Sequence, residues 1–181
     1  MQDTAAFTGE TTMHDLLEIF PGAQRALFRK YHIGGCASCG FRPDETLAQV
    51  CARNEELPVD DVITYLVASQ EEDARAQISP AELAQALRDG AARLIDVRTR
   101  EEFEAARIEG ATLLNRDLMQ EILSNWDKSG PLVFVDHRGL RAMDAAAFFA
   151  GHGFTQARAL RGGIDAWSQE IDPSIPRYHL E

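Results

Sequence analysis

The sequence predicts a small all-helical domain over residues 1–75 and an α/β domain over residues 76–181, with a parallel sheet covered by helices on both faces. Two observations support the α/β domain. Short apolar segments alternate with amphipathic segments beyond residue 77, and such alternation is typical of a parallel sheet. The continuous apolar run Pro131-Leu-Val-Phe-Val135 is typical of a strand that is buried on both faces.

Local signals place the elements of the first domain. Its expected helices begin near Thr12, at Pro21, at Pro43 and near Pro58. Proline is favoured at the first helical position because its fixed φ suits a helix and its missing N–H is not needed there. The segment Gln70–Gln77 is either a linker or the end of the last helix. The first domain therefore contains four or five short helices.

In the second domain, Ser79 and Glu82 form an expected capping box, and Gly90 ends the helix that this box begins. Strands are expected at 93–97, 111–114, 131–135 and 157–160, and further helices at 101–107, 118–126, 141–151 and 163–170. This order predicts a sheet in which each strand is followed by a helix.

The charge excludes some partners. The chain carries 18 Lys and Arg residues against 29 Asp and Glu residues, a formal net charge of −11. Phosphate binding needs clustered cations, so no nucleic-acid partner is expected. No apolar stretch approaches the length that spans a bilayer, and the polar N-terminal residues do not resemble a signal peptide, so we expect no membrane partner and a cytoplasmic protein.

The second domain resembles the rhodanese family over residues 77 to about 177. The motifs that carry the resemblance are Leu94-Ile-Asp-Val-Arg98, Glu101-Glu-Phe103, Ile108-Glu-Gly-Ala111 and Arg161-Gly-Gly-Ile-Asp-Ala-Trp167. Between them, Phe134-Val-Asp-His-Arg-Gly-Leu-Arg141 matches the active-site loop. The resemblance implies a rhodanese-like fold in which backbone N–H groups of this loop and the dipole of the following helix stabilise a thiolate and its persulfide.

The loop departs from the family at its nucleophile. Gly139 and Arg141 match the family's glycine and arginine, but Asp136 stands where a sulfurtransferase has cysteine, and no cysteine occurs in this domain. The resemblance therefore implies an inactive loop consisting of Asp136, His137, Arg138, Gly139, Leu140 and Arg141. Arg107 also replaces a histidine that is usual in the family.

Two interpretations of Asp136 remain. In the first, the carboxylate accepts loop N–H bonds and caps the following helix, as a stable anion in an anion's place. In the second, Asp136 is a catalytic carboxylate. We favour the first, since the loop offers no further carboxylates. We expect His137 to be a solvated loop histidine, Arg141 to pair with Asp136, and Arg138 to be available to an anionic ligand.

Cysteine chemistry is confined to the first domain. Cys36 and Cys39 form a C-x-x-C turn shortly before a predicted helix, where the helix dipole lowers the pKa of a thiol. Such a thiolate attacks disulfides or accepts sulfur, and the second cysteine resolves the product. Cys51 lies on the apolar face of its helix and is expected to be a buried hydrophobic residue.

Residues 12–68 resemble two related small modules: the redox-disulfide domain associated with hybrid-cluster proteins, and the N-terminal domain of di-iron proteins that repair iron–sulfur clusters. The resemblance is carried by Tyr31-His-Ile-Gly-Gly-Cys-Ala-Ser-Cys-Gly40 and Thr46-Leu-Ala-Gln-Val-Cys51. The C-x-x-C spacing favours the first module, because the repair proteins have adjacent cysteines.

The sequence thus favours a rhodanese-like binding or regulatory module without its own nucleophile, joined to a domain that responds to redox state or sulfur through Cys36 and Cys39. Its partner would be a protein or a small anionic or sulfur-containing ligand, and no cofactor is expected. One alternative is a sulfurtransferase or persulfide carrier in which Cys36 and Cys39 supply the thiol. Another is zinc or iron–sulfur binding by Cys36, Cys39, Cys51 and His32. The last is a pair of unreactive turn cysteines.

Overall fold

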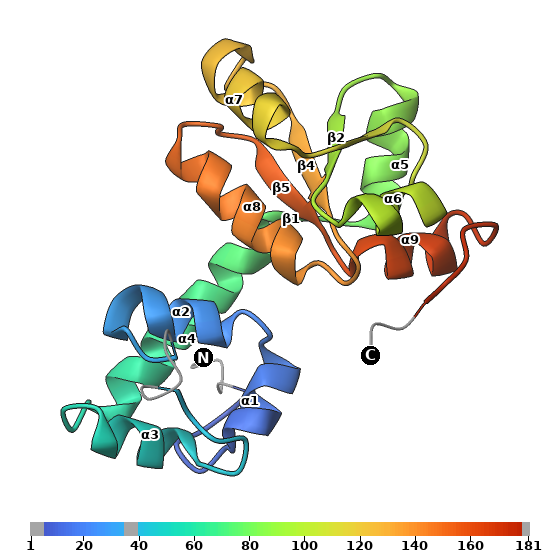
Figure 1. Cartoon of the computed structure of the whole chain (residues 1–181). Coiled ribbons are helices and arrows are strands. Elements are labelled where there is room, and N and C mark those ends of the chain that lie inside the picture. The colour runs from blue at the N-terminus through green and yellow to red at the C-terminus, as the bar shows by residue number, and fades with distance from the viewer. Residues whose placement is uncertain (1–5, 35–39, 179–181) are drawn as a thin grey trace. The chain divides into compact units, whose positions relative to one another are not determined.

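The computed structural model describes residues 6–34 and 40–178, and the chain divides into two compact units between Ala74 and Arg75 (Figure 1). Each unit has its own hydrophobic core. No helix in the described ranges has the length and apolar character that crossing a bilayer requires.

The described part of the first unit contains four helices around one core. They are α1 (Met13–Ile19), α2 (Ala23–Tyr31), α3 (Leu47–Arg53) and α4 (Val59–Arg75). Each helix contributes to the core, with Leu16, Leu27, Val50 and Leu66 among the residues that are fully removed from solvent. The Thr12 hydroxyl accepts a hydrogen bond from the Asp15 N–H, so the cap predicted for α1 is confirmed.

Two predicted helix starts in this unit are wrong. Helix α2 begins at Ala23 rather than at Pro21, and α3 begins at Leu47 rather than at Pro43. The start of α3 is fixed by a capping box of Thr46 and Gln49, in which each side chain bonds the other residue's N–H. Capping by these side chains outweighs the proline signal.

Helix α4 runs to Arg75, so most of the segment that sequence left open as a linker is the end of a helix. Its last turns are held to α2 by an ion pair between the Asp73 carboxylate and the Arg25 guanidinium at 2.5 Å. The ion pair neutralises one of the acidic side chains that made the segment resemble a linker.

The second unit contains a five-stranded sheet in which every described pairing is parallel, as predicted. The strands are β1 (Gln77–Ile78), β2 (Arg93–Asp96), β3 (Ala111–Leu113), β4 (Leu132–Val135) and β5 (Ala157–Leu160), in the order β1-β5-β4-β2-β3. All four residues of β4 are buried, which confirms a strand covered on both faces.

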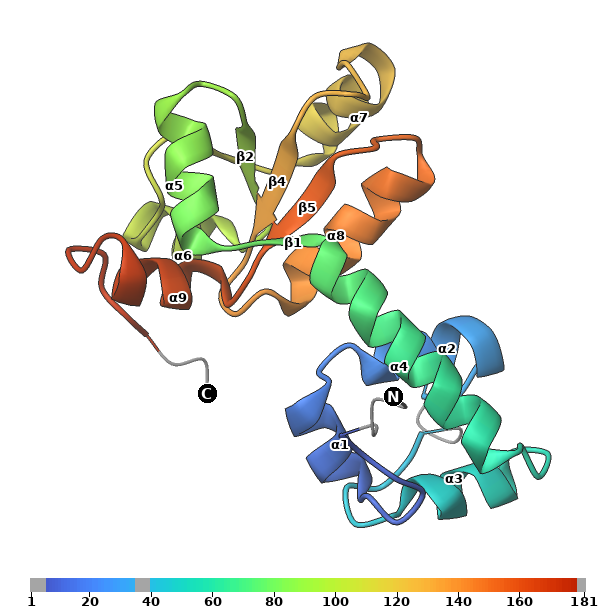
Figure 2. The ribbon, with the colours of Figure 1, turned by 180° about the vertical axis from the view of Figure 1, so that it is seen from behind.

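Helices cover both faces of the sheet (Figures 1 and 2). They are α5 (Pro80–Arg88), α6 (Arg100–Ala105), α7 (Arg116–Asn125), α8 (Leu140–Gly151) and α9 (Gly163–Glu170). Side chains of α5 and α9 pack into one core on one face, and those of α7 and α8 pack into another on the opposite face. The capping box predicted at the start of α5 is confirmed.

The strand order creates a switch point between β2 and β4. The chain leaves β2 toward β3 on one side, whereas it leaves β4 toward β5 on the other. Ligand sites of open α/β sheets lie outside the carboxyl ends of the strands at such a point. The loops after Asp96 and after Val135 therefore enclose the expected location of a site.

Candidate functional site

The loop that follows β4 is short and closely packed. It consists of Asp136–Gly139, and α8 begins directly after it at Leu140. Gly139 has a φ of 98°, a left-handed conformation that favours glycine, and a methyl group there would lie only 3.2 Å from the Leu160 carbonyl oxygen. The glycine thus allows the loop to turn sharply against β5.

The carboxylate of Asp136 is seated among N–H groups of this loop. The Gly139 N–H donates to Oδ1 at 2.5 Å and the Arg141 N–H donates to Oδ2 at 2.8 Å. Asp136 is only 3% exposed. The prediction that this carboxylate accepts loop N–H bonds at the start of a helix is confirmed.

Burial and hydrogen bonding act in opposite directions on the charge of this carboxyl group. Burial raises the pKa of Asp136 above its ordinary value, and the N–H groups of Arg141 and Gly139 only partly offset this effect. Loss of water thus outweighs the hydrogen bonds that favour the anion. The loop thus holds a carboxyl group whose ionised form is less favoured than it is in solution.

A buried ion pair lies at the end of the neighbouring strand. Asp96 is the last residue of β2, and its carboxylate accepts hydrogen bonds from Arg98 Nε at 3.0 and 3.1 Å and from Arg98 Nη2 at 2.6 Å. Both side chains are fully buried. Burial opposes the charge on Arg98, but its bonds to Asp96 and to Tyr178 raise its pKa overall. The pair fixes the Arg98 guanidinium beside the switch point.

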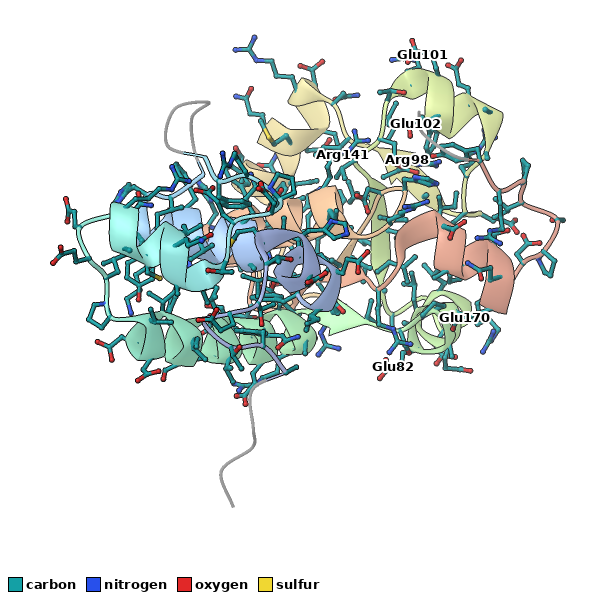
Figure 3. All side chains as sticks on the ribbon, turned by 90° about the horizontal axis from the view of Figure 1, so that it is seen from below. Glu82, Arg98, Glu101, Glu102, Arg141 and Glu170 are labelled. Carbon is teal, nitrogen blue, oxygen red and sulfur yellow. The ribbon has the colours of Figure 1, made fainter. Side chains whose placement is uncertain are left out.

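Helix α6 carries a further carboxylate, that of Glu102, near the switch point. Figure 3 labels Arg98, Glu102 and Arg141 on one part of the second unit. Burial opposes ionisation of Glu102, but N–H and hydroxyl donors from Thr99 and Tyr178, together with the nearby charge of Arg141, lower its pKa. Arg98 and Glu102 lie in motifs that carry the family resemblance, but their place beside the loop was not predicted.

His137 is buried rather than solvated, which corrects the sequence prediction. It is 5% exposed, and its ring stacks on the Tyr178 ring with the centroids 4.4 Å apart. Its Nε2 lies 2.8 Å from the carbonyl oxygen of Tyr178. Tyr178 could not be predicted from the sequence, because nothing near it in the chain indicates that it returns to a loop 41 residues earlier.

Three residues in the loop and directly after it are exposed to solvent. Arg138 and Arg141 are exposed, and Leu140 between them is 52% exposed. The contact that Arg141 makes with Asp136 at hydrogen-bond distance is through its main-chain N–H, and its charge lowers the Asp136 pKa from further away. The loop and the first turn of α8 therefore expose one apolar side chain and two cations.

The predicted redox pair, Cys36 and Cys39, lies outside the described residues. Cys51 is 1% exposed in the core of the first unit, and burial raises the pKa of its thiol. Its predicted burial is confirmed. His32, the fourth residue of the alternative metal site, is exposed and follows the end of α2 in a left-handed conformation.

The second unit defines a class of α/β protein in which a loop joins the central parallel strand to a helix and holds a side-chain carboxyl group with main-chain N–H groups. The chain belongs to the rhodanese-like domain family, whose pattern matches residues 79–170.

Relatives support this assignment. The thiosulfate sulfurtransferase GlpE of Pseudomonas savastanoi pv. phaseolicola is 34% identical over 88 residues, which cover 49% of this chain and 83% of the relative. GlpE of Pseudomonas aeruginosa strain LESB58 is 30% identical over 95 residues, which cover 52% of this chain and 86% of the relative.

Two solved structures are also similar to this chain. The human single-domain sulfurtransferase TSTD1 is 28% identical, with a TM-score of 0.48 over 52% of this chain and 96% of that protein. The reduced Bacillus anthracis CoADR-RHD is 18% identical, with a TM-score of 0.52 over 75% of this chain and 22% of that protein. The second likeness concerns the fold alone.

Proposed function

We propose that the second unit is a binding or regulatory module whose loop does not itself carry sulfur. The observation that supports this function is the buried Asp136 carboxylate, held by the N–H groups of Gly139 and Arg141. Sulfur transfer requires a thiolate that attacks a sulfur donor, and a carboxylate does not perform this step. Residues 75–181 contain no cysteine that could replace it.

The exposed residues Arg138, Leu140 and Arg141 support a small anionic ligand or an acidic protein segment as the partner. Arg138 and Arg141 supply positive charge on a chain whose net charge is −11, and Leu140 supplies an exposed apolar side chain. Charge complementarity of this kind favours encounter with an anion and suppresses binding of cations.

We further propose that the first unit responds to redox state or to sulfur through Cys36 and Cys39. This part of the proposal depends on the C-x-x-C spacing and on the chemistry of a thiolate paired with a resolving thiol. Binding at the loop would then be coupled to the state of the two cysteines. Cys51 is not part of this chemistry, because it is buried in the core.

The first experiment measures thiocyanate formed from thiosulfate and cyanide. We expect the wild-type protein to form none above the rate without protein, and the Asp136→Cys variant to acquire sulfur that cyanide removes, because the cradle consists of main-chain N–H groups. Asp136→Ser is the matched control, since it has a similar size but no thiol. An ordinary enzymatic rate in a Cys36→Ser, Cys39→Ser double variant would exclude the proposal.

The alternative sulfurtransferase function is favoured by the relatives, which are named thiosulfate sulfurtransferases. In that case Cys36 or Cys39 would attack the outer sulfur of thiosulfate, releasing sulfite and leaving a persulfide on the cysteine. Mass spectrometry after incubation with thiosulfate distinguishes the two functions. A mass increase of one sulfur atom on the peptide containing Cys36 and Cys39, absent in the double variant, supports the alternative. An unmodified peptide supports the binding module.

A further inference from the structure

The C-terminal segment 175–178, here called the strap, is fixed at both of its ends. At its start, the carbonyl oxygen of the buried Ile175 accepts a hydrogen bond from the buried Ser168 hydroxyl of α9 at 2.7 Å. Near its end, the Arg177 guanidinium contacts the Asp165 carboxylate at 2.7 and 3.1 Å. The strap therefore has a defined path beside the candidate loop.

Tyr178 covers the His137 face of the loop. The two rings are stacked with an interplanar angle of 17°, and His137 Nε2 lies at hydrogen-bond distance from the Tyr178 carbonyl oxygen. Asp165, which holds Arg177, also donates its N–H to the His137 carbonyl oxygen at 3.2 Å. Side chain and main chain of His137 are thus both held by the strap or by its anchor.

The Tyr178 hydroxyl links the strap to two further elements of the site. It accepts a hydrogen bond from Arg98 Nη1 at 2.9 Å and donates one to Glu102 Oε1 at 3.0 Å. The Arg98 guanidinium is itself fixed by Asp96. A phenol that both accepts and donates fits this position, and a phenylalanine would leave a buried donor of Arg98 without this acceptor.

Residues of the loop and of the first turn of α8 therefore differ in access. His137 and Asp136 are 5% and 3% exposed, whereas Leu140 is 52% exposed and both neighbouring arginines are on the surface. A ligand that reached the His137 ring would have to displace Tyr178 from its stack.

We propose that the strap is a gate, in which Tyr178 closes the approach of a ligand to His137 and leaves the exposed residues Arg138, Leu140 and Arg141 as the accessible part of the site. The proposal takes the loop as the binding surface of the proposed function. Its own test requires no ligand, so failure of the gate and failure of the binding function are distinguishable.

Reactivity of His137 toward diethyl pyrocarbonate tests the gate in the full chain. Rates for each histidine are measured by mass spectrometry of peptides, and the exposed residues His14 and His152 are internal standards. In the wild type we expect His137 to react at least about tenfold more slowly than the standards, which corresponds to about 1.4 kcal/mol. Tyr178→Ala should bring its rate close to theirs.

Two further variants separate the gate from general loosening. Tyr178→Phe keeps the ring and the carbonyl group, so we expect a smaller increase than with Tyr178→Ala. Arg177→Ala removes an anchor of the strap and should also increase the His137 rate, while leaving the His14 and His152 rates unchanged. If His137 in the wild type reacts as fast as the standards, or if none of the three variants raises its rate, the proposal is wrong.

Discussion

Substitution of Gly163 by alanine tests whether the candidate loop is packed against the start of α9 as described. A methyl group on Gly163 would lie 2.5 Å from the Asp136 carbonyl oxygen and 2.5 Å from the carbonyl carbon and oxygen of His137. The N–H groups of Ile164 and Asp165 already bond these two carbonyl oxygens, at 2.9 and 3.2 Å. The loop therefore has to move to accommodate the methyl group, and both hydrogen bonds would be strained.

Gly90 provides a matched control. Its φ of 64° is close to the 61° of Gly163, but a methyl group on Gly90 would meet nothing within 4 Å. Both substitutions incur the cost of a left-handed alanine, about 1–2 kcal/mol. Overpacking of the loop should add about 1–3 kcal/mol at Gly163 alone. We therefore expect a loss of unfolding free energy of about 1–2 kcal/mol for Gly90→Ala and about 2–5 kcal/mol for Gly163→Ala.

Urea unfolding followed by tryptophan fluorescence measures these values. Both tryptophans, Trp126 and Trp167, lie in the second unit, so their emission reports on the unit that contains the loop. The free energies are obtained by linear extrapolation to water. Equal losses in the two variants would refute the close packing of the loop against α9.

Three further predictions concern buried groups. Because burial raises the pKa of Asp136, the folded state binds its proton more tightly than the unfolded state does. The unfolding free energy of the wild type relative to Asp136→Asn should therefore fall as pH rises from about 4 through the raised pKa. Urea titrations at several pH values check the sign of this change. Arg98→Ala should lower the unfolding free energy by about 3–5 kcal/mol, since it leaves the Asp96 carboxylate buried without its cation, and a loss below about 1 kcal/mol would contradict the description of this pair. Cys51 should react with a thiol reagent only after the first unit unfolds, because burial both covers the thiol and raises its pKa; rapid reaction in a Cys36→Ser, Cys39→Ser background without denaturant would disprove this.

Elements of the second unit with strong local signals were predicted closely. The strand β5 and the helix α9 begin and end where the sequence placed them, and the capping box of Ser79 and Glu82 fixed the start of α5. In these cases glycine punctuation, capping or hydrophobic pattern within a few residues decides the structure.

Features that depend on distant contacts were not predicted. The two-residue strand β1 is recognisable only through its pairing with β5, where Gln77 lies opposite Ala159. The burial of His137 depends in the same way on Tyr178, and no local pattern predicts that stack. Sequence located the carboxylate of Asp136 among the loop N–H groups, but the direction of its pKa shift follows from burial, which only the fold reveals.

The position of Tyr178 also determines when the loop is completed during synthesis. A ribosome adds about 5–20 residues per second, and His137 precedes Tyr178 by 41 residues, so about 2–8 seconds separate the synthesis of these two residues. During this interval the newly made loop lacks its cover, and the Arg98 guanidinium lacks one of its acceptors. The contacts of the loop can therefore be completed only late in synthesis, after Tyr178 has been added.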